Sequence, residues 1–236
     1  MMRSREEDHI EGGGRIRSII LGLNDGLIST FTLLVGVAAA TIATVGNIIV
    51  ILTGIAAMVS GAISMGLGEY ISSKSEYNYI KNEIKKEEAE IELFPEEEKE
   101  EIRDIFKDMG LSEVLLDQCV DKITSNKETW LNFLIGNELG LDEPEDPLLG
   151  ALLTFISFII GALIPLSPYF LNLGFISLII SSIFSFSMLG IVGATKTKIT
   201  GESRLKGAVE MLVIGTIAFI CSFGIGLWLE HFFVNA

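Results

Sequence analysis

Cysteine and histidine are scarce in this chain of 236 residues, which contains two of each. Cys119 and Cys221 are far apart, so the sequence indicates neither a disulfide bond nor a thiolate metal site. His9 and His231 are also isolated from each other, and residues 72–147 contain no histidine. This absence excludes the Glu-x-x-His pairs that carboxylate di-iron enzymes use. We therefore predict that the chain is not an enzyme.

Charged residues are nearly missing from several long apolar blocks. Hydrophobic residues make up 49% of the chain, and they are bunched instead of recurring periodically as in a soluble domain. Each block approaches the roughly 20 residues that a helix needs to cross a bilayer core. The predicted spans are 18–41, 47–70, 148–169, 172–195 and 207–230. We expect an all-α polytopic membrane protein with five transmembrane helices and a helical insert, and a tight external turn marked by Pro165 and Pro168.

Lysine and arginine are confined to three segments, and this distribution predicts the orientation. All 17 lie before the first span, between the second and third spans, or between the fourth and fifth. An odd number of spans puts these segments on one side, which the positive-inside rule makes the cytoplasm. No cleavable signal peptide is expected, because the first apolar run is long enough to stay in the membrane. The predicted parts are a cytoplasmic N-terminal segment 1–17, transmembrane helices 18–71, a cytoplasmic insert 72–147, transmembrane helices 148–230 and an external tail 231–236.

The insert holds most of the acidity of the chain. Residues 72–147 contain 22 acidic and nine basic residues, a net charge of −13 against −14 for the whole chain. The sequence runs from the second span into the insert without a glycine or proline, so we expect one helix that continues to Phe94-Pro95. Gly110 and Gly140 predict the ends of later helices, and Asn126 predicts a helix N-cap. The insert is therefore expected to be a small helical domain.

Glutamates recur at helical spacing on both sides of the break at Phe94-Pro95. Glu83, Glu87 and Glu90 form one stripe at i, i+4 and i+7, and Glu98 and Glu101 lie on the next helix. If that helix folds back, the two stripes face each other, and like charges repel unless a cation lies between them. Carboxylate oxygens suit divalent ions such as Mn(II) and Fe(II). A solvated acidic helix face explains the same pattern, and spacing alone does not separate the two interpretations.

Asp25 lies in the stretch "GLNDGLIST", inside the first predicted span. An aspartate at the centre of a membrane helix costs roughly 2.5–3.5 kcal/mol on insertion scales. No basic residue is placed in any span to pair with it. Asp25 is therefore a candidate functional residue, and the alternative is a structural role such as capping a kink.

Four stretches taken together resemble the vacuolar iron transporter family. They are "GLNDGLIST", "SGAISMGLGEYIS", the acidic helical insert and "WLNFLIGNELGLDEP", and the resemblance extends from about residue 15 to the end of the fifth span. It implies a dimeric five-helix protein that exports a divalent metal from the cytosol by proton antiport, without a bound cofactor or a nucleic-acid partner. It also implies that Asp25 and Met65 line the transport path. The glutamates that it implies for a cytosolic metal-binding domain are Glu87, Glu90, Glu98, Glu101 and Glu138.

The insert departs from the plant-type members of this family at one place. Those members carry two adjacent methionines shortly before the last glutamate, where this chain has Leu134 and Ile135. The absence of soft sulfur ligands favours an all-oxygen site that tolerates Mn(II) as well as Fe(II). Core packing is the alternative role for these two residues.

Asp25 and Met65 are expected at a similar depth in the membrane. At 1.5 Å per residue, Asp25 lies about 12 Å and Met65 about 9 Å from the cytosolic ends of their helices. Glu69 follows Met65 by one turn, so the three residues can form a ladder on which metal and protons compete. Met65 can also be a packing residue, and Glu69 can be an interfacial one. A passive channel of the same architecture and a metal sensor that does not transport are the alternatives, in a prokaryotic plasma membrane or a vacuolar membrane.

Overall fold

The computed structural model describes residues 13–41, 46–111, 113–141, 145–200 and 203–234, and every regular element in these residues is a helix. The α-helices are α1 (Gly13–Thr41), α2 (Asn47–Leu93), α3 (Pro95–Asp108), α4 (Glu113–Thr124), α5 (Lys127–Asn137), α6 (Pro147–Leu166), α7 (Phe175–Thr200) and α8 (Arg204–Leu229). A 3-10 helix, η1 (Ser167–Leu171), follows α6, and a π-helical turn, η2 (Glu230–Val234), follows α8. The predicted all-α class is confirmed.

The chain divides into two compact units. One consists of Met1–Ile71 and Leu148–Ala236, here called the membrane unit, and the other of Ser72–Pro147, here called the insert unit. Five helices are long and apolar enough to cross a membrane, namely α1, α2, α6 extended by η1, α7 and α8. The prediction of five such helices is confirmed.

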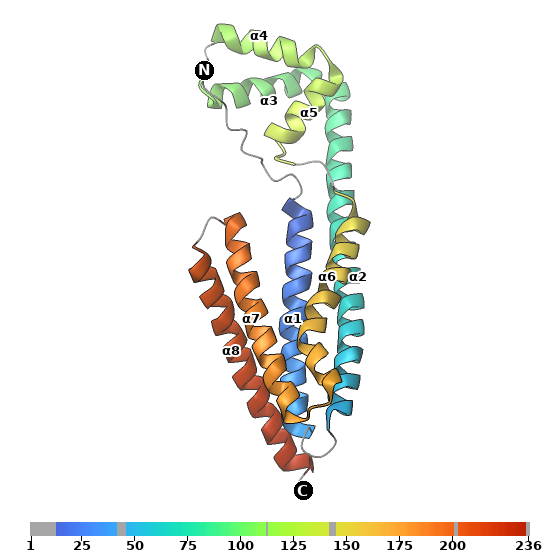
Figure 1. The fold of residues 1–236 in the computed structure, drawn as a ribbon. Coiled ribbons are helices and arrows are strands. Elements are labelled where there is room, and N and C mark those ends of the chain that lie inside the picture. The colour runs from blue at the N-terminus through green and yellow to red at the C-terminus, as the bar shows by residue number, and fades with distance from the viewer. Residues whose placement is uncertain (1–12, 42–45, 112, 142–144, 201–202, 235–236) are drawn as a thin grey trace. The chain divides into compact units, whose positions relative to one another are not determined.

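Within the membrane unit, α1 lies between the pair α7–α8 and the pair α2–α6 (Figure 1). Its contact with α6 leaves no room for side chains at two glycines. A Cβ atom at Gly26 would lie 2.2 Å from the Phe158 carbonyl oxygen, and one at Gly161 would lie 2.2 Å from the Leu23 carbonyl oxygen. Small residues at such crossings let helix backbones approach closely. Asp25 therefore lies next to a close backbone contact between α1 and α6.

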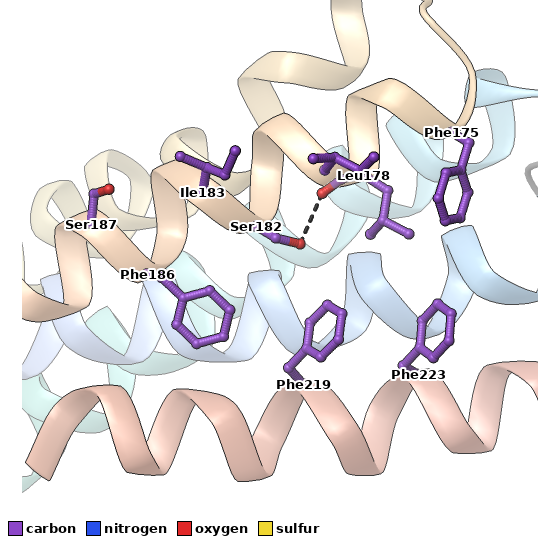
Figure 2. Close-up of a pocket in the computed structure, with 9 residues that line it drawn as sticks. Phe175, Leu178, Ser182, Ile183, Phe186, Ser187, Phe219 and Phe223 are labelled. Atoms are coloured by element: carbon purple, nitrogen blue, oxygen red, sulfur yellow. Dashed lines mark hydrogen bonds between the residues drawn. The ribbon is translucent and has the colours of Figure 1, made fainter. Parts of the chain in front are cut away.

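Helices α7 and α8 also meet through glycines, because a Cβ atom at Gly193 would lie 2.3 Å from the Gly207 carbonyl oxygen. Toward the other end of the pair, a cavity of about 590 Å³ opens between them. Figure 2 shows Phe219 and Phe223 of α8 facing the α7 side of this cavity. Their rings stack with centroids 5.6 Å apart. The two helices thus converge at their glycines and separate around aromatic rings.

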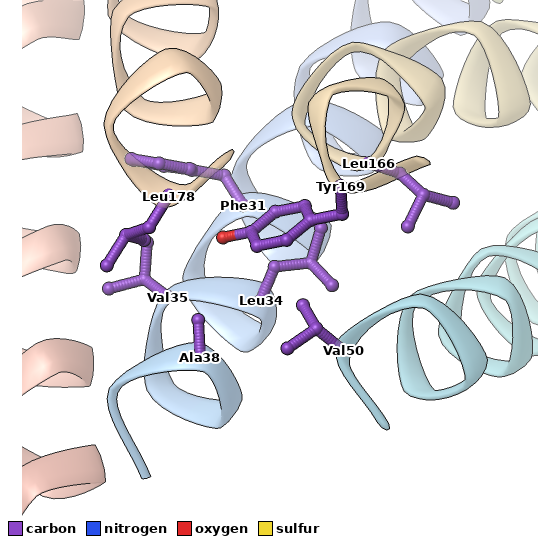
Figure 3. Close-up of a cluster of buried hydrophobic side chains, with 8 residues drawn as sticks. All are labelled: Phe31, Leu34, Val35, Ala38, Val50, Leu166, Tyr169 and Leu178. Carbon is purple, nitrogen blue, oxygen red and sulfur yellow. The ribbon is translucent and has the colours of Figure 1, made fainter. Parts of the chain in front are cut away.

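Tyr169 of η1 occupies the centre of the largest buried hydrophobic cluster. It is fully buried together with Phe31 and Leu34 of α1. Figure 3 shows its ring above α1, with the hydroxyl oxygen directed toward Val35 and Leu178. The short helix η1 thus anchors the end of α6 against α1 and α7.

The position predicted for the turn after α6 is wrong by several residues. Pro165 lies inside α6 and is buried, and its carbonyl oxygen accepts a 2.6 Å hydrogen bond from Ser181 Oγ. A proline near the end of a helix removes one backbone donor without ending the helix. The chain instead reverses at Asn172 and Gly174, which have positive φ angles of 53° and 59°.

Helix ends in the insert unit lie where proline and capping residues of its sequence predict them. Helix α2 ends at Leu93 and α3 begins at Pro95, while the Asn126 side chain accepts hydrogen bonds from the backbone of Glu128 and Thr129 at the start of α5. Its core comprises Ile91, Ile102, Leu116, Val120, Trp130 and Leu134. Leu134 is fully buried, which favours core packing as its role, and Ile135 is half-buried.

The close approach of α1 to α6 makes Gly161 sensitive to a single added carbon. We expect Gly161→Ala to lower the free energy of unfolding by about 1–3 kcal/mol, because the new methyl group overlaps the α1 backbone. Gly224→Ala in α8 is the control, since nothing lies within 4 Å of its added Cβ atom; it should stay within about 1 kcal/mol of the parent. Denaturant titration in detergent micelles measures both, and equal stability of the two variants would contradict the packing described here.

Candidate metal sites

Asp25 and Met65 line one cavity of about 390 Å³ in the membrane unit. Helices α1, α2 and α6 form its walls, and its lining includes the hydroxyl residues Ser29, Thr30 and Ser64. Ser29 lies one turn after Asp25, and its hydroxyl donates a hydrogen bond to the Asp25 carbonyl oxygen. The cavity thus presents one carboxylate, one thioether and several hydroxyl groups.

This donor set suits a divalent transition metal. Asp25 is half-buried, and no lysine or arginine pairs with it among the described residues. A carboxylate in an apolar setting needs a proton or a cation to offset its charge. The carboxylate is a hard ligand and the Met65 sulfur a soft one, so together they fit a borderline ion such as Fe(II). Ser29 and Ser64 were not predicted from the sequence. Ser29 follows Asp25 by one turn, and Ser64 directly precedes Met65.

Glu69 lies outside the lining of this cavity, one turn along α2 from Met65. Ser18 Oγ of α1 donates a 2.9 Å hydrogen bond to Glu69 Oε1, and Thr154 Oγ1 of α6 donates a 3.4 Å hydrogen bond to the Ser18 carbonyl oxygen. The carboxylate is therefore held where α1, α2 and α6 meet. Ser18 was missed by the sequence reasoning, although it precedes Asp25 by seven residues and so shares its helix face.

Three carboxylates converge in the insert unit. Glu87 of α2, Glu98 of α3 and Glu138 at the C-cap of α5 each offer one oxygen, and these oxygens lie within 4.8 Å of one another. Glu87 and Glu98 are only 3% and 5% exposed. Glu87 Oε1 and Glu98 Oε2 are buried without a hydrogen-bond partner among the described residues. Two buried oxygens within 4.8 Å of a third carboxylate oxygen make this cluster a candidate cation site.

Burial and mutual repulsion perturb this cluster strongly. Burial raises the pKa of Glu87 to about 7, and the Glu138 carboxylate adds to the effect. Burial likewise raises the pKa of Glu98 to about 7, reinforced by Glu101 and Glu87. The pKa of Glu138 rises to about 7 through burial and its interaction with Glu101. Protons therefore compete with a metal near neutral pH, well above the glutamate value of about 4.3 in model peptides.

The remaining predicted glutamates differ in position. Glu90 and Glu101 are close enough to raise the pKa of the clustered carboxyl groups. Glu83 stands apart from the cluster and forms an ion pair with Lys86. Facing stripes thus account for Glu87 and Glu98, whereas Glu83, one turn earlier on α2, pairs within its own helix.

Histidine and cysteine do not contribute to these sites within the described residues. His231 lies in η2 with its ring against Phe232, and His9 lies outside the described residues. Cys119 and Cys221 are both free thiols.

The raised pKa values predict that the metal-free insert unit loses stability as pH rises from about 5 to about 8. The folded state holds protons on carboxyl groups whose pKa is about 7, against an ordinary value of 4.5. The stabilisation is therefore complete below the ordinary value and is lost as pH rises through 7. Unfolding in chelator can be followed by Trp130 fluorescence in a Trp228→Phe background.

Glu87→Gln should flatten this pH dependence, since it removes one of the titrating groups. Glu97→Gln is the matched control, because Glu97 is exposed on α3 and should leave the profile unchanged. Stability that is constant or rises over the same pH range would show that these carboxyl groups are solvated.

Comparison with known proteins agrees with the motifs and the fold. A model of the VIT family matches residues 16–227. The chain is 33% identical over 221 residues to "Vacuolar iron transporter 1" of Tulipa gesneriana, covering 92% of this chain and 88% of that protein. It is 34% identical over 228 residues to "Vacuolar iron transporter 1" of Arabidopsis thaliana, covering 95% and 90%. The "Vacuolar iron transporter" of Plasmodium falciparum is 31% identical over 237 residues, covering 95% and 86%.

All three relatives are named as transporters, in agreement with the prediction that the chain is not an enzyme. The family match covers most of the chain, including α1 with Asp25, α2 with Met65 and the whole insert unit. The chain therefore belongs to the VIT family, a family of membrane metal transporters.

Proposed function

We propose that the protein exports a divalent transition metal, Fe(II) or Mn(II), from the cytosol in exchange for protons. The observation that carries this proposal is the cavity lined by both Asp25 and Met65 in the membrane unit. A site with one carboxylate and one thioether binds a borderline divalent ion without holding it as strongly as a full ligand cage would. Release on the far side requires such moderate binding.

The proposed orientation places segment 1–17 and insert 72–147 in the cytosol and the tail 231–236 outside. It is supported by the confinement of all 17 lysine and arginine residues to three segments that share one side of a five-span chain. Helices within 18–71 and 148–230 then cross the bilayer. This bilayer is the plasma membrane in a prokaryote or the vacuolar membrane in a eukaryote.

In the insert, the clustered glutamates collect the metal from the cytosol. The buried oxygens of Glu87 and Glu98 gain a cationic partner when a metal binds, and the accessible Glu138 completes the site. Glu90 and Glu101 add negative charge around it. Because Leu134 belongs to the core, the proposed site consists of oxygen ligands and accepts Mn(II) and Fe(II) with similar strength.

In the membrane unit, a metal ion and a proton bind alternately to the Asp25 carboxylate. A carboxylate there is satisfied by one or the other but not by both, which is the condition that antiport requires. Met65 contributes the soft ligand, and Glu69 is the entry carboxylate, fixed in place by Ser18.

A second copy of the chain is part of the proposal. Ser29 and Ser64 line the cavity and are exposed in the single chain. Lipid tails offer these hydroxyl groups and the neighbouring Asp25 no hydrogen bonds. A homodimer that covers this side of α1 and α2 would remove the carboxylate from lipid.

The carboxylate cluster predicts high-affinity Mn(II) binding by the purified protein. In an Asp25→Asn background, which silences the membrane site, Glu87→Gln with Glu98→Gln should weaken binding by more than the about 10–100-fold that outer-shell changes cost. Glu96→Gln with Glu97→Gln is the control, because both residues are exposed on the same helix. If calorimetric titration gives equal binding for the two double variants, the cluster is not the binding site.

Transport itself can be tested in proteoliposomes loaded with a pH dye. We expect metal uptake to be accompanied by proton movement in the opposite direction, with a rate that follows an imposed pH gradient. Asp25→Asn should nearly abolish uptake, and Met65→Leu should slow it. Met58→Leu is the matched control, since Met58 lies two turns earlier on α2 and packs against apolar clusters.

Two outcomes would contradict the proposal. Normal transport by folded Asp25→Asn protein would remove Asp25 from the path. Metal flux that ignores the pH gradient would identify a passive channel instead of an antiporter.

A further inference from the structure

Two groups of hydroxyl side chains in the membrane unit differ in their hydrogen bonds. In the first group, each hydroxyl donates to the carbonyl oxygen four residues earlier in its own helix. Examples are Thr32 to Ile28 at 2.6 Å, Ser182 to Leu178 at 2.8 Å and Thr195 to Ile191 at 2.7 Å. Figure 2 shows the bond made by Ser182. These hydroxyl groups are satisfied locally and need no other partner.

The second group faces the interior and makes no such bond. Ser177, Ser181 and Ser185 are each 0% exposed, and their spacing of four residues places them along one face of α7. Tyr169 and Thr30 are 0% and 1% exposed on the neighbouring elements. We call these five residues the hydroxyl column.

The outer end of the column is connected by hydrogen bonds. Asn47 Nδ2 donates to Ser177 Oγ at 2.8 Å and to the Tyr169 carbonyl oxygen at 3.1 Å. Ser177 Oγ also accepts from the Leu173 backbone N–H at 3.2 Å. A serine oxygen that accepts twice keeps its own hydrogen for donation further along the column.

The middle of the column contains an unused hydroxyl. Ser181 Oγ donates to the Pro165 carbonyl oxygen, and the Tyr169 hydroxyl lies beside Ser181 but has no partner with hydrogen-bond geometry. In Figure 3 this hydroxyl points toward Val35 and Leu178, between α1 and α7. It therefore lies inside the protein and not against lipid.

The inner end of the column reaches the Asp25 cavity. Ser185 Oγ and Thr30 Oγ1 are buried without partners among the described residues. The rings of their chain neighbours Phe31 and Phe186 lie 5.6 Å apart, so Ser185 and Thr30 are at the same level of α7 and α1. Thr30 also lines the cavity that contains Asp25. The column thus extends from Asn47 to Thr30 at the edge of the Asp25 cavity.

Three unpartnered hydroxyl groups in one interior need an explanation. Burying a polar group without a hydrogen bond is unfavourable, and an apolar residue of the same shape avoids this cost. Buried polar groups that lack protein partners are ordinarily bridged by internal water. Hydroxyl groups and water are also the components from which proton relays are built.

We propose that the hydroxyl column, completed by internal water, conducts protons between the outer end of the membrane unit and Asp25. In each step an oxygen accepts a proton from one neighbour and releases its own hydrogen to the next. One proton has then moved, and the column is restored once the hydroxyl groups and waters have turned back. This proposal rests on the proposed antiport. The column contains neither carboxylate nor sulfur, so it offers no charged or soft ligand to offset the desolvation of a divalent metal, whereas protons move along hydroxyl and water oxygens.

The test uses full-length protein in proteoliposomes with an internal pH dye. Ser185→Ala combined with Tyr169→Phe removes two hydroxyl groups with little change of shape, and neither residue lines the metal cavity. We expect proton-coupled Mn(II) uptake to fall by about tenfold or more, as when one proton-transfer group is lost. Mn(II) affinity and thermal stability should be unchanged, because the deleted groups are not metal ligands and have no protein partner among the described residues.

Ser182→Ala combined with Thr195→Val is the matched control, because both hydroxyl groups are bonded within their own helix. This control should transport at the wild-type rate. The proton column would be overturned if the Ser185→Ala, Tyr169→Phe protein carried out coupled transport at the wild-type rate. It would also be overturned if this protein lost Mn(II) binding or folding. Neither outcome would contradict antiport. Wild-type protein that moves metal without protons would instead refute the antiport proposal, and the column with it.

Discussion

A carboxylate that is withdrawn from water must gain a proton or a cation, and both candidate sites depend on this constraint. Asp25 meets it in an apolar helix bundle, while Glu87 and Glu98 meet it in the small core of the insert unit. In neither place does a lysine or arginine of the described residues supply the missing charge. The surface acids behave differently, since Glu96 pairs with Lys99 and Glu100 with Arg103. Exposed pairs of this kind contribute little to stability.

The packing of the helices determines which carboxylates are withdrawn from water. Gly26 and Gly161 bring α1 and α6 into backbone contact, so Asp25 cannot move away from its cavity without opening that contact. In the insert, Ile91, Ile102 and Leu134 draw α2, α3 and α5 together and carry Glu87, Glu98 and Glu138 with them. The candidate sites are therefore consequences of helix packing, and each gathers its candidate ligands from more than one helix.

Much of this could be predicted from the sequence because it depends on local chemistry. Apolar length marks the five long helices, Phe94-Pro95 marks the break between α2 and α3, and Asn126 caps α5. Pro165 misled the prediction because a proline near a helix end is compatible with both a turn and a helix. Glu83 lies four residues before Glu87, on the same face of α2, so the sequence pattern treats the two alike. The packing of α3 and α5 against α2 determines that the turn with Glu87 faces the cluster. Ser18 and Tyr169 make their contacts between elements, which no local pattern reveals.

The half-titrated state of the Glu87–Glu98–Glu138 cluster has an electrostatic consequence. With pKa values of about 7, the metal-free cluster at neutral pH already carries protons that balance part of its charge. A divalent ion that bound at this candidate site would displace those protons, so loading would be an exchange of cations that changes the net charge by less than two. The field of the strongly acidic insert, whose formal net charge with every carboxyl group ionised is −13, would therefore change little between the empty and the loaded state.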